Sequence, residues 1–177
     1  MRFQRPGLEI NLGSIGKGHA LDGVSAQLRD EWNVPAALLH GGHSSIYALG
    51  SEPGGTRGWP AGLLDPDDAQ KRLAVLRLLD RGMGTSAATY QHLEYQGRTL
   101  PHLLDPRTSW PAEGMLMATA TAPGAALADA LATAFFILGV ERTRAYCATH
   151  PDIGAVLLPN TPERKLVVMG RALGEIV

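Results

Sequence analysis

The sequence predicts an α+β fold, with a mostly antiparallel sheet packed against helices in a single domain over residues 1–177. Two observations predict this class. Strand-like segments outnumber helical ones, and short turns rich in Gly, Pro and Asp join neighbouring strands as in hairpins. A very apolar helix at residues 125–140 needs a surface to pack against. The sequence contains neither an internal repeat nor a linker long enough to divide the chain.

The N-terminal elements are predicted from alternation and glycine content. Residues 8–13, LEINLG, are strand-like, and the glycines within residues 13–18 then turn the chain. A helix is expected from about Ala20 to Trp32. Residues 35–50 then fit a buried strand, a Gly-rich turn and a second strand.

The rest of the chain is predicted to be rich in strands. Residues 58–80 fit a strand, an Asp-Pro turn and a strand of Leu and Val. Residues 82–112 fit loop and short strand, because glycine and prolines interrupt them. A strand at 114–123 is expected to lead into the apolar helix, and the segments 154–159 and 165–170 are expected to form a closing hairpin.

The apolar helix carries two polar side chains one turn apart, Asp129 and Thr133. Gly139 stands where this helix would end, and a short helix over residues 141–150 is expected next. A buried carboxylate requires a cation, several hydrogen-bond donors or a metal. The alternative is that both polar groups line a narrow hydrated strip. An apolar stripe is expected on the opposite side, made of Leu127, Leu131, Ala134, Phe135 and Leu138.

Composition excludes several classes of protein. The net charge of −1, without a run of Lys and Arg, provides no electrostatic basis for binding nucleic acid. The single cysteine, Cys147, excludes an intramolecular disulfide. Apolar runs fall short of the roughly 20 residues that span a bilayer, so no transmembrane segment is expected in this chain. The first residues lack the apolar centre of a signal peptide.

Two Gly-rich strings could contact a ligand. In GSIGKG, residues 13–18, glycines before a helix would expose backbone N–H groups to an anion, and Lys17 adds a positive charge. The spacing does not match a Walker phosphate loop, and the alternative is a tight turn with Lys17 in solvent. In HGGHSSIYALG, residues 40–50, the glycines would let a ligand approach the backbone.

The string HLLDPRTSWPA, residues 102–112, places a histidine before an Asp-Pro turn. His102 could act as a general base near neutral pH, and Arg107 could pair with a carboxylate or a phosphate. The alternative is an ordinary turn with a partly exposed imidazole. A zinc site is not expected, because the histidines lack zinc-binding spacing.

Together these strings resemble the ApbE-type flavin transferases in order and spacing over roughly residues 8 to 140. The family strings resemble D-L-G-G-I-A-K-G-x-A-x-D, G-G-D-I-x-A-L-G, W-x-x-G-I-x-D-P, T-S-G, H-I-x-D-P-x-T-G-x-P and A-D-A-x-x-T-A. The counterparts here are NLGSIGKGHALD, HGGHSSIYALG, GWPAGLLDP, GTSAATY, HLLDPRTSWPA and ADALATAFFILG. Six ordered matches are far more specific than any single one.

The resemblance implies an ApbE-like, T-fold-like domain that moves FMN from FAD onto a Thr or Ser hydroxyl of an acceptor flavoprotein and releases AMP, with Mg²⁺ at the diphosphate. Some members instead hydrolyse FAD, and a non-catalytic flavin- or nucleotide-binding module is a further alternative. His102 matches the family's base. The backbone oxygen of Gly16 and the side chains of Asp129 and Thr133 match its metal ligands. The nucleotide would be held by Lys17, Gly41, Gly42, Ser44, Ser45, Thr85 and Ser86.

Some residues depart from the family pattern. Asn11 stands where the family has Asp, GGHSSI replaces GGDI, Ala87 follows Thr85-Ser86 where Gly is usual, and Ser109 also replaces a Gly. The usual module carries on the order of a hundred residues before the first string, so the chain is expected to be the C-terminal portion of that module. Family members are often periplasmic or membrane-anchored.

Overall fold

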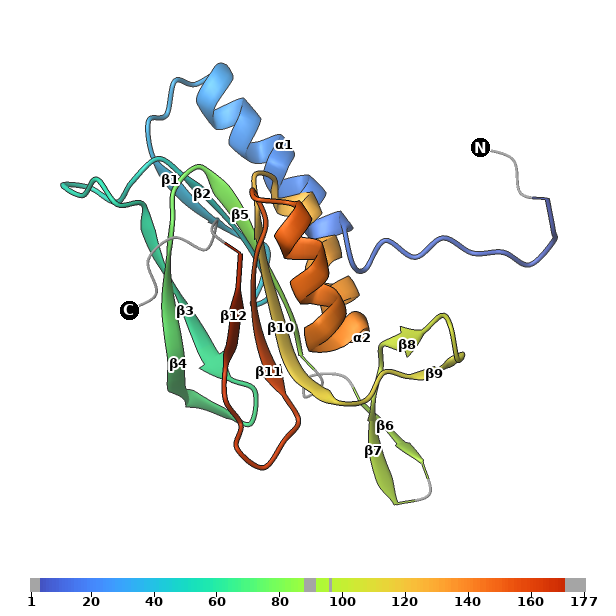
Figure 1. Cartoon of the computed structure of the whole chain (residues 1–177). Coiled ribbons are helices and arrows are strands. Elements are labelled where there is room, and N and C mark those ends of the chain that lie inside the picture. The colour runs from blue at the N-terminus through green and yellow to red at the C-terminus, as the bar shows by residue number, and fades with distance from the viewer. Residues whose placement is uncertain (1–3, 88–91, 96, 171–177) are drawn as a thin grey trace.

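A computed structural model describes residues 4–87, 92–95 and 97–170 and shows an α+β domain. Its main sheet has the order β1-β2-β5-β10-β11-β12, and each neighbouring pair is antiparallel. Within the described residues, helices α1 (Gly16–Asp30) and α2 (Ala125–Thr149) cover one face (Figure 1). The strands are β1 (Ala37–His40), β2 (Ser45–Leu49), β5 (Arg81–Ala87), β10 (Met115–Ala122), β11 (Gly154–Pro159) and β12 (Val167–Met169).

The opposite face of the sheet is covered by a long hairpin of β3 (Trp59–Asp65) and β4 (Asp68–Leu78) (Figure 1). Successive residues of a strand point to opposite faces, and β10 shows the result. Met117 packs with the hairpin, whereas Ala118 and Ala120 pack with α2. Two apolar clusters therefore enclose the sheet, and Phe135 and Phe136 are among the fully buried side chains of the helical layer.

Helix α2 lies directly against the backbone of β5 because that strand carries glycines where the helix crosses it. A Cβ added at Gly82 would lie 2.4 Å from Ala125 Cα, and one at Gly84 would lie 2.5 Å from Ala128 O. Both distances are shorter than any real Cβ contact, so a side chain at either position would push the helix away. The missing side chains bring α2 close enough for its polar groups to meet the sheet.

Two small hairpins extend past the end of the main sheet (Figure 1). One pairs β6 (His92–Tyr95) with β7 (Arg98–Pro101). The other pairs β8 (Leu104–Asp105) with β9 (Trp110–Pro111). The segment between β7 and β8 contains His102, so the hairpins set the position of that residue.

The structure confirms the α+β class and its antiparallel sheet, and corrects several elements. Residues 8–12 are exposed and do not form a strand, and they pair with no strand in the described part of the chain. Alternation there creates strand propensity, but a strand forms only where its backbone groups are paired. Helix α1 begins at Gly16, before the expected Ala20. Residues 82–87, expected as loop with short strand, belong to the central strand β5. Residues 88–91 and 96 of that expected loop lie outside the described residues.

Helix α2 consists of two helical segments that meet at a kink at Gly139, whose φ of 73° and ψ of −174° are non-helical. The structure therefore confirms that the apolar helix ends at Gly139 and that a shorter helix follows it. The expected apolar stripe is only partly buried, because Leu127 is 44% exposed. The face that packs on β5 carries Ala125, Ala128 and Asp129 instead. Small residues face the sheet because β5 offers bare backbone at that place.

Candidate active site

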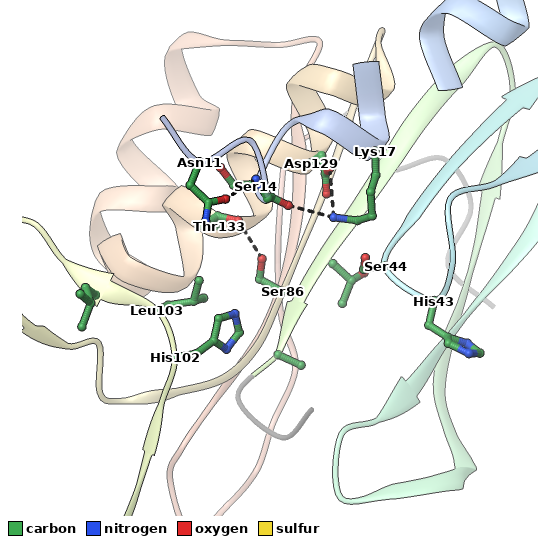
Figure 2. A pocket seen from close by; sticks show the side chains of 14 residues that line it. Asn11, Ser14, Lys17, His43, Ser44, Ser86, His102, Leu103, Asp129 and Thr133 are labelled. Atoms are coloured by element: carbon green, nitrogen blue, oxygen red, sulfur yellow. Dashed lines mark hydrogen bonds and ion pairs between the residues drawn. The ribbon is translucent and has the colours of Figure 1, made fainter. Parts of the chain in front are cut away.

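A cavity of about 840 Å³ opens where α1, α2, β5 and the β7–β8 segment meet (Figure 2). Lys17 enters it from α1, Ser86 from β5, Asp129 and Thr133 from α2, and His102 from the β7–β8 segment. The full lining is Asn11, Gly13, Ser14, Lys17, His43, Ser44, Thr85, Ser86, Ala87, His102, Leu103, Leu104, Asp129 and Thr133.

The Asp129 carboxylate is buried and bonded on both oxygens. Asp129 is 5% exposed. Oδ2 accepts the backbone N–H of Gly18 at 3.2 Å, and Oδ1 accepts the hydroxyl of Ser45 at 2.9 Å. The Lys17 ammonium lies 3.5 Å from Oδ2. Of the possible partners for a buried carboxylate, the protein supplies two donors and a cation, and the Asp129 side chain still borders the cavity.

Gly18 brings α1 onto the first turn of α2. A Cβ at this position would lie 2.2 Å from Ala125 O, so only glycine allows this approach. One turn further along α1, Asp22 accepts the N–H groups of Ala125 at 2.6 Å and of Ala126 at 2.9 Å. The residue before them, Gly124, has no side chain with which to cap the helix. Helix α1 therefore caps α2 across 103 positions of sequence.

The Gly-rich turn before α1 holds Lys17 at the cavity. Asn11 Oδ1 accepts the N–H of Gly13 at 2.7 Å, which closes the turn. Lys17 Nζ donates to the Gly13 carbonyl at 3.0 Å and remains 41% exposed. The ammonium therefore lies between the turn and Asp129, with one side open to the cavity, where it adds positive charge at the start of a helix.

Two pairs of hydroxyl groups involve β5: one joins this strand to α2, and the other joins it to the neighbouring strand β10. Ser86 Oγ and Thr133 Oγ1 are 3.1 Å apart, and Thr85 Oγ1 and Thr119 Oγ1 are 2.9 Å apart. Four residues of a helix advance about 6 Å, and two residues of a strand advance about 6.7 Å. One turn of α2 therefore matches two residues of β5: Gly84 lies against Asp129, and Ser86 lies against Thr133.

His102 is exposed at the edge of the cavity, and the residues that follow it are anchored by two sets of hydrogen bonds. The Ala112 N–H donates to the carbonyl of Leu103 at 2.8 Å. Arg107 donates to both carboxylate oxygens of Asp105, at 2.8 Å and 2.5 Å, and to the carbonyl of Ile137 in α2 at 3.2 Å. The Arg107 guanidinium lowers the pKa of Asp105 to about 2. Arg107 therefore pairs with a carboxylate of its own turn.

Most of the predicted site residues meet in this one place. The cavity lining includes Lys17, Ser44, Thr85, Ser86, His102, Asp129 and Thr133. Gly16, Gly41, Gly42 and Ser45 are outside the lining: Gly16 is the first residue of α1, and the other three belong to the β1–β2 turn and the start of β2. Gly41 N donates to the Ser45 carbonyl at 2.8 Å, and Gly42 has a positive φ of 76°.

Sequence reasoning missed several contributors. Asn11 departs from the family pattern, and its role in closing the turn was not predicted. Ser14 and Leu104 line the cavity without having been predicted individually, whereas His43 belongs to the turn, residues 41–45, that was expected to hold the nucleotide. The cap by Asp22 was missed, although the sequence offered a signal: the helix at residue 125 begins after Pro-Gly, without a capping side chain.

Fold and cavity together define an α+β domain with a polar site suited to a phosphorylated ligand, because a helix start, a lysine and hydroxyl groups surround one opening. The ApbE family matches residues 1–157, and the chain belongs to this family.

Relatives in the family carry a consistent name. FAD:protein FMN transferase of Klebsiella pneumoniae (strain 342) is 31% identical over 168 residues, covering 94% of this chain and 50% of the relative. FAD:protein FMN transferase of Treponema pallidum (strain Nichols) is 32% identical over 167 residues, covering 89% and 46%. The chain thus spans about half the length of the curated relatives it matches.

Solved structures have the same fold. The ApbE protein of Thermotoga maritima aligns with a TM-score of 0.78 at 25% identity, covering 93% of this chain and 52% of that one. The flavinyl transferase ApbE of Pseudomonas stutzeri aligns with a TM-score of 0.73 at 26% identity, covering 93% and 50%. Neither helix of the described residues has the length and apolar character that crossing a membrane requires.

Proposed function

We propose that this chain catalyses the Mg²⁺-dependent transfer of FMN from FAD to a Thr or Ser hydroxyl of an acceptor flavoprotein, with release of AMP. The observation that carries the proposal is the meeting of Asp129, Lys17 and His102 at one cavity. The relatives' name, FAD:protein FMN transferase, supports the transfer of FMN from FAD to a protein.

The donor set fits Mg²⁺. Asp129 and Thr133 offer a carboxylate and a hydroxyl at the cavity, and the carboxylate already lies 3.5 Å from a cation, the Lys17 ammonium. The described residues contain no group of three or more His, Cys, Asp or Glu side chains suited to a metal. Mg²⁺ suits such a sparse site, because it is usually held by one or two carboxylates, waters and substrate phosphates. Asp129, Thr133 and the Gly16 carbonyl would hold the ion, which would supply positive charge for the diphosphate.

The N-terminal turn and the β1–β2 turn would hold the FAD diphosphate. Lys17 contributes a charge that is 41% exposed and close to the cavity, so it can pair with a phosphate oxygen. Gly41, Gly42, Ser44 and Ser45 lie in the β1–β2 turn and at the start of β2, and Thr85 and Ser86 lie on the neighbouring strand β5. The backbone of the turn and the hydroxyl groups of Ser44, Thr85 and Ser86 would orient the nucleotide by hydrogen bonds. The hydroxyl of Ser45 is fully buried and bonds Asp129 instead.

His102 would remove the proton from the acceptor hydroxyl. The hydroxyl oxygen then forms a bond to the FMN phosphorus, and the bond from that phosphorus to the bridging oxygen breaks. The bridging oxygen leaves with AMP, and the proton stays on His102. The exposure of His102 at the edge of the cavity suits this role, because a protein acceptor must reach the base from outside.

The test is incubation of the purified chain with FAD and Mg²⁺, with and without an acceptor flavoprotein domain. We expect AMP release and a covalently bound yellow product with the acceptor, both lost when EDTA removes Mg²⁺. AMP and free FMN without a covalent product would replace transfer by FAD hydrolysis. Binding of FAD without AMP release would identify a non-catalytic binding module instead.

A further inference from the structure

We propose that Asp22 is a positioning residue for Asp129, which it acts on by fixing the distance between the first turns of α1 and α2. The inference rests on the proposed function only where Mg²⁺ binding is the readout. Asp22 does not line the cavity, and its carboxylate is 2.6 Å and 2.9 Å from the N–H groups of Ala125 and Ala126.

The first turn of α2 depends on a carboxylate from another helix. The N-terminal N–H groups of a helix need outside acceptors, usually a side chain of the preceding residue. Here that residue is Gly124, in an extended conformation with φ −115° and ψ 150°. Asp22 accepts the first two N–H groups together, and its negative charge also faces the positive end of the helix dipole.

The turn of α1 that precedes Asp22 touches Asp129. Gly18 and Asp22 are four residues apart and so share one face of α1. Gly18 packs its bare Cα against Ala125 O and donates its N–H to Asp129 Oδ2 at 3.2 Å. Asp129 itself is one turn beyond Ala125. Because backbone meets backbone at this crossing, a small shift between the helices breaks the Gly18–Asp129 bond and reorients the carboxylate.

Capping alone would not require a carboxylate from α1. Serine at position 124 could cap α2 from within its own chain segment, since the φ and ψ of Gly124 suit any residue. The three atoms nearest to a Cβ there all belong to the Asp22 carboxylate, with Oδ2 at 3.2 Å. Asp22→Ala removes that contact. The pair of variants Asp22→Ala and Asp22→Ala with Gly124→Ser therefore separates capping of α2 from linkage of α2 to α1.

The experiment measures three properties of these variants and of the milder Asp22→Asn. They are the thermal midpoint, hydrogen exchange of the Gly18 amide by NMR, and Mg²⁺ affinity in the presence of ADP. The matched control is Asp30→Asn, which makes the same charge change on an exposed part of α1. We expect Asp22→Ala to lower the midpoint by about 2–6 °C. We also expect Gly18 exchange to accelerate about tenfold and Mg²⁺ affinity to fall about 10–100-fold.

The double variant decides the question. We expect it to recover most of the midpoint while Gly18 exchange stays fast and Mg²⁺ affinity stays low. Recovery of all three properties would reduce Asp22 to a helix cap and overturn the proposal, as would unchanged Gly18 exchange in both Asp22→Ala and Asp22→Asn. If the wild-type chain shows no response to Mg²⁺, the metal part of the proposed function fails, and Gly18 exchange still decides the role of Asp22.

Discussion

The two ends of the cavity are built in contrasting ways. At one end, Asp129 is 5% exposed and is bonded by Gly18 from α1 and Ser45 from β2. At the other end, His102 is exposed on the segment before a two-residue strand, and its neighbour Leu104 is 59% exposed. Asp129 belongs to the buried part of the domain, whereas the hairpins on either side of the His102 segment extend past the end of the main sheet (Figure 1).

This contrast matches two different tasks in the proposed reaction. Charge stabilisation at a diphosphate works best from groups that are already in place, because no reorganisation is then needed during the reaction. A base that serves a protein acceptor must instead be reachable from solvent. Changes at the Asp129 end should therefore affect metal, nucleotide and stability together, whereas changes at the His102 end should affect the transfer step alone.

Asp129→Asn should have the largest effect. It keeps the shape of the side chain but removes the charge, so turnover should fall about 10³-fold. The rise in thermal midpoint that Mg²⁺ gives with ADP present should disappear. Calorimetry and an AMP-release assay measure the two effects. Turnover that kept the wild-type requirement for Mg²⁺ would remove Asp129 from the set of ligands.

His102→Ala should slow transfer to the acceptor by about 10²–10³-fold while FAD affinity stays within about twofold. The reason is that the imidazole would act on the acceptor proton and not on the nucleotide. Rapid-quench measurement of AMP and titration of FAD separate the two quantities. His150→Ala, at the far end of α2, is the control. A parallel loss of FAD affinity would assign His102 to binding.

Gly84→Ala tests the close packing that underlies the Asp129 end. The new Cβ would lie 2.5 Å from Ala128 O, which is a backbone atom and cannot rotate away. The free energy of unfolding should fall by about 1–3 kcal/mol. Gly23→Ala is the matched control, because a Cβ there meets nothing within 4 Å and alanine favours a helix. Urea unfolding of both variants gives the comparison, and equal stability would show that α2 can move off the strand without cost.

At the Asp129 end of the cavity, the sequence predicted the polar residues better than it predicted strand β5, on which they pack. The ordered motifs predicted that Asp129, Thr133 and Lys17 belong to one site, and the three residues line one cavity. The role of residues 82–87 could not be predicted, because a strand containing Gly82 and Gly84 has low intrinsic β-propensity. It forms because β2 and β10 pair with it on both sides and α2 covers it, and those contacts come from distant parts of the chain.

The strand error at residues 8–12 has the opposite cause. Leu8, Ile10 and Leu12 alternate as in a strand, yet they are 54%, 53% and 61% exposed. Alternating apolar and polar residues show that a segment could form a strand, but the strand forms only where a neighbouring strand is available to pair with it. Asp22 shows a third limit, because a cap supplied from 103 positions away leaves no local capping pattern.

Protonation of Asp105 should produce the smallest effect, at the His102 end. Arg107 holds the pKa of Asp105 at about 2, below its ordinary value of 3.8. Because the folded-state pKa is the lower one, the contribution of this carboxylate to stability is complete above about pH 4 and is lost as the pH falls through about 2. Between pH 7 and pH 4, the turn after His102 should therefore stay closed.

NMR titration of the Asp105 carboxyl group and exchange of the Arg107 amide, which donates to Asp105 Oδ1 at 2.9 Å, measure this directly. Asp105→Asn should open the turn already at pH 7 and reduce transfer only a few-fold, since the Ala112–Leu103 hydrogen bond still anchors the segment. Arg107→Lys keeps the positive charge but loses the bidentate hydrogen bonding to Asp105. It should therefore raise the pKa of Asp105 part of the way toward 3.8. A wild-type carboxyl group that titrates near 3.8 would mean that Arg107 does not hold this turn in solution, and the two ends of the cavity would then differ even more in rigidity.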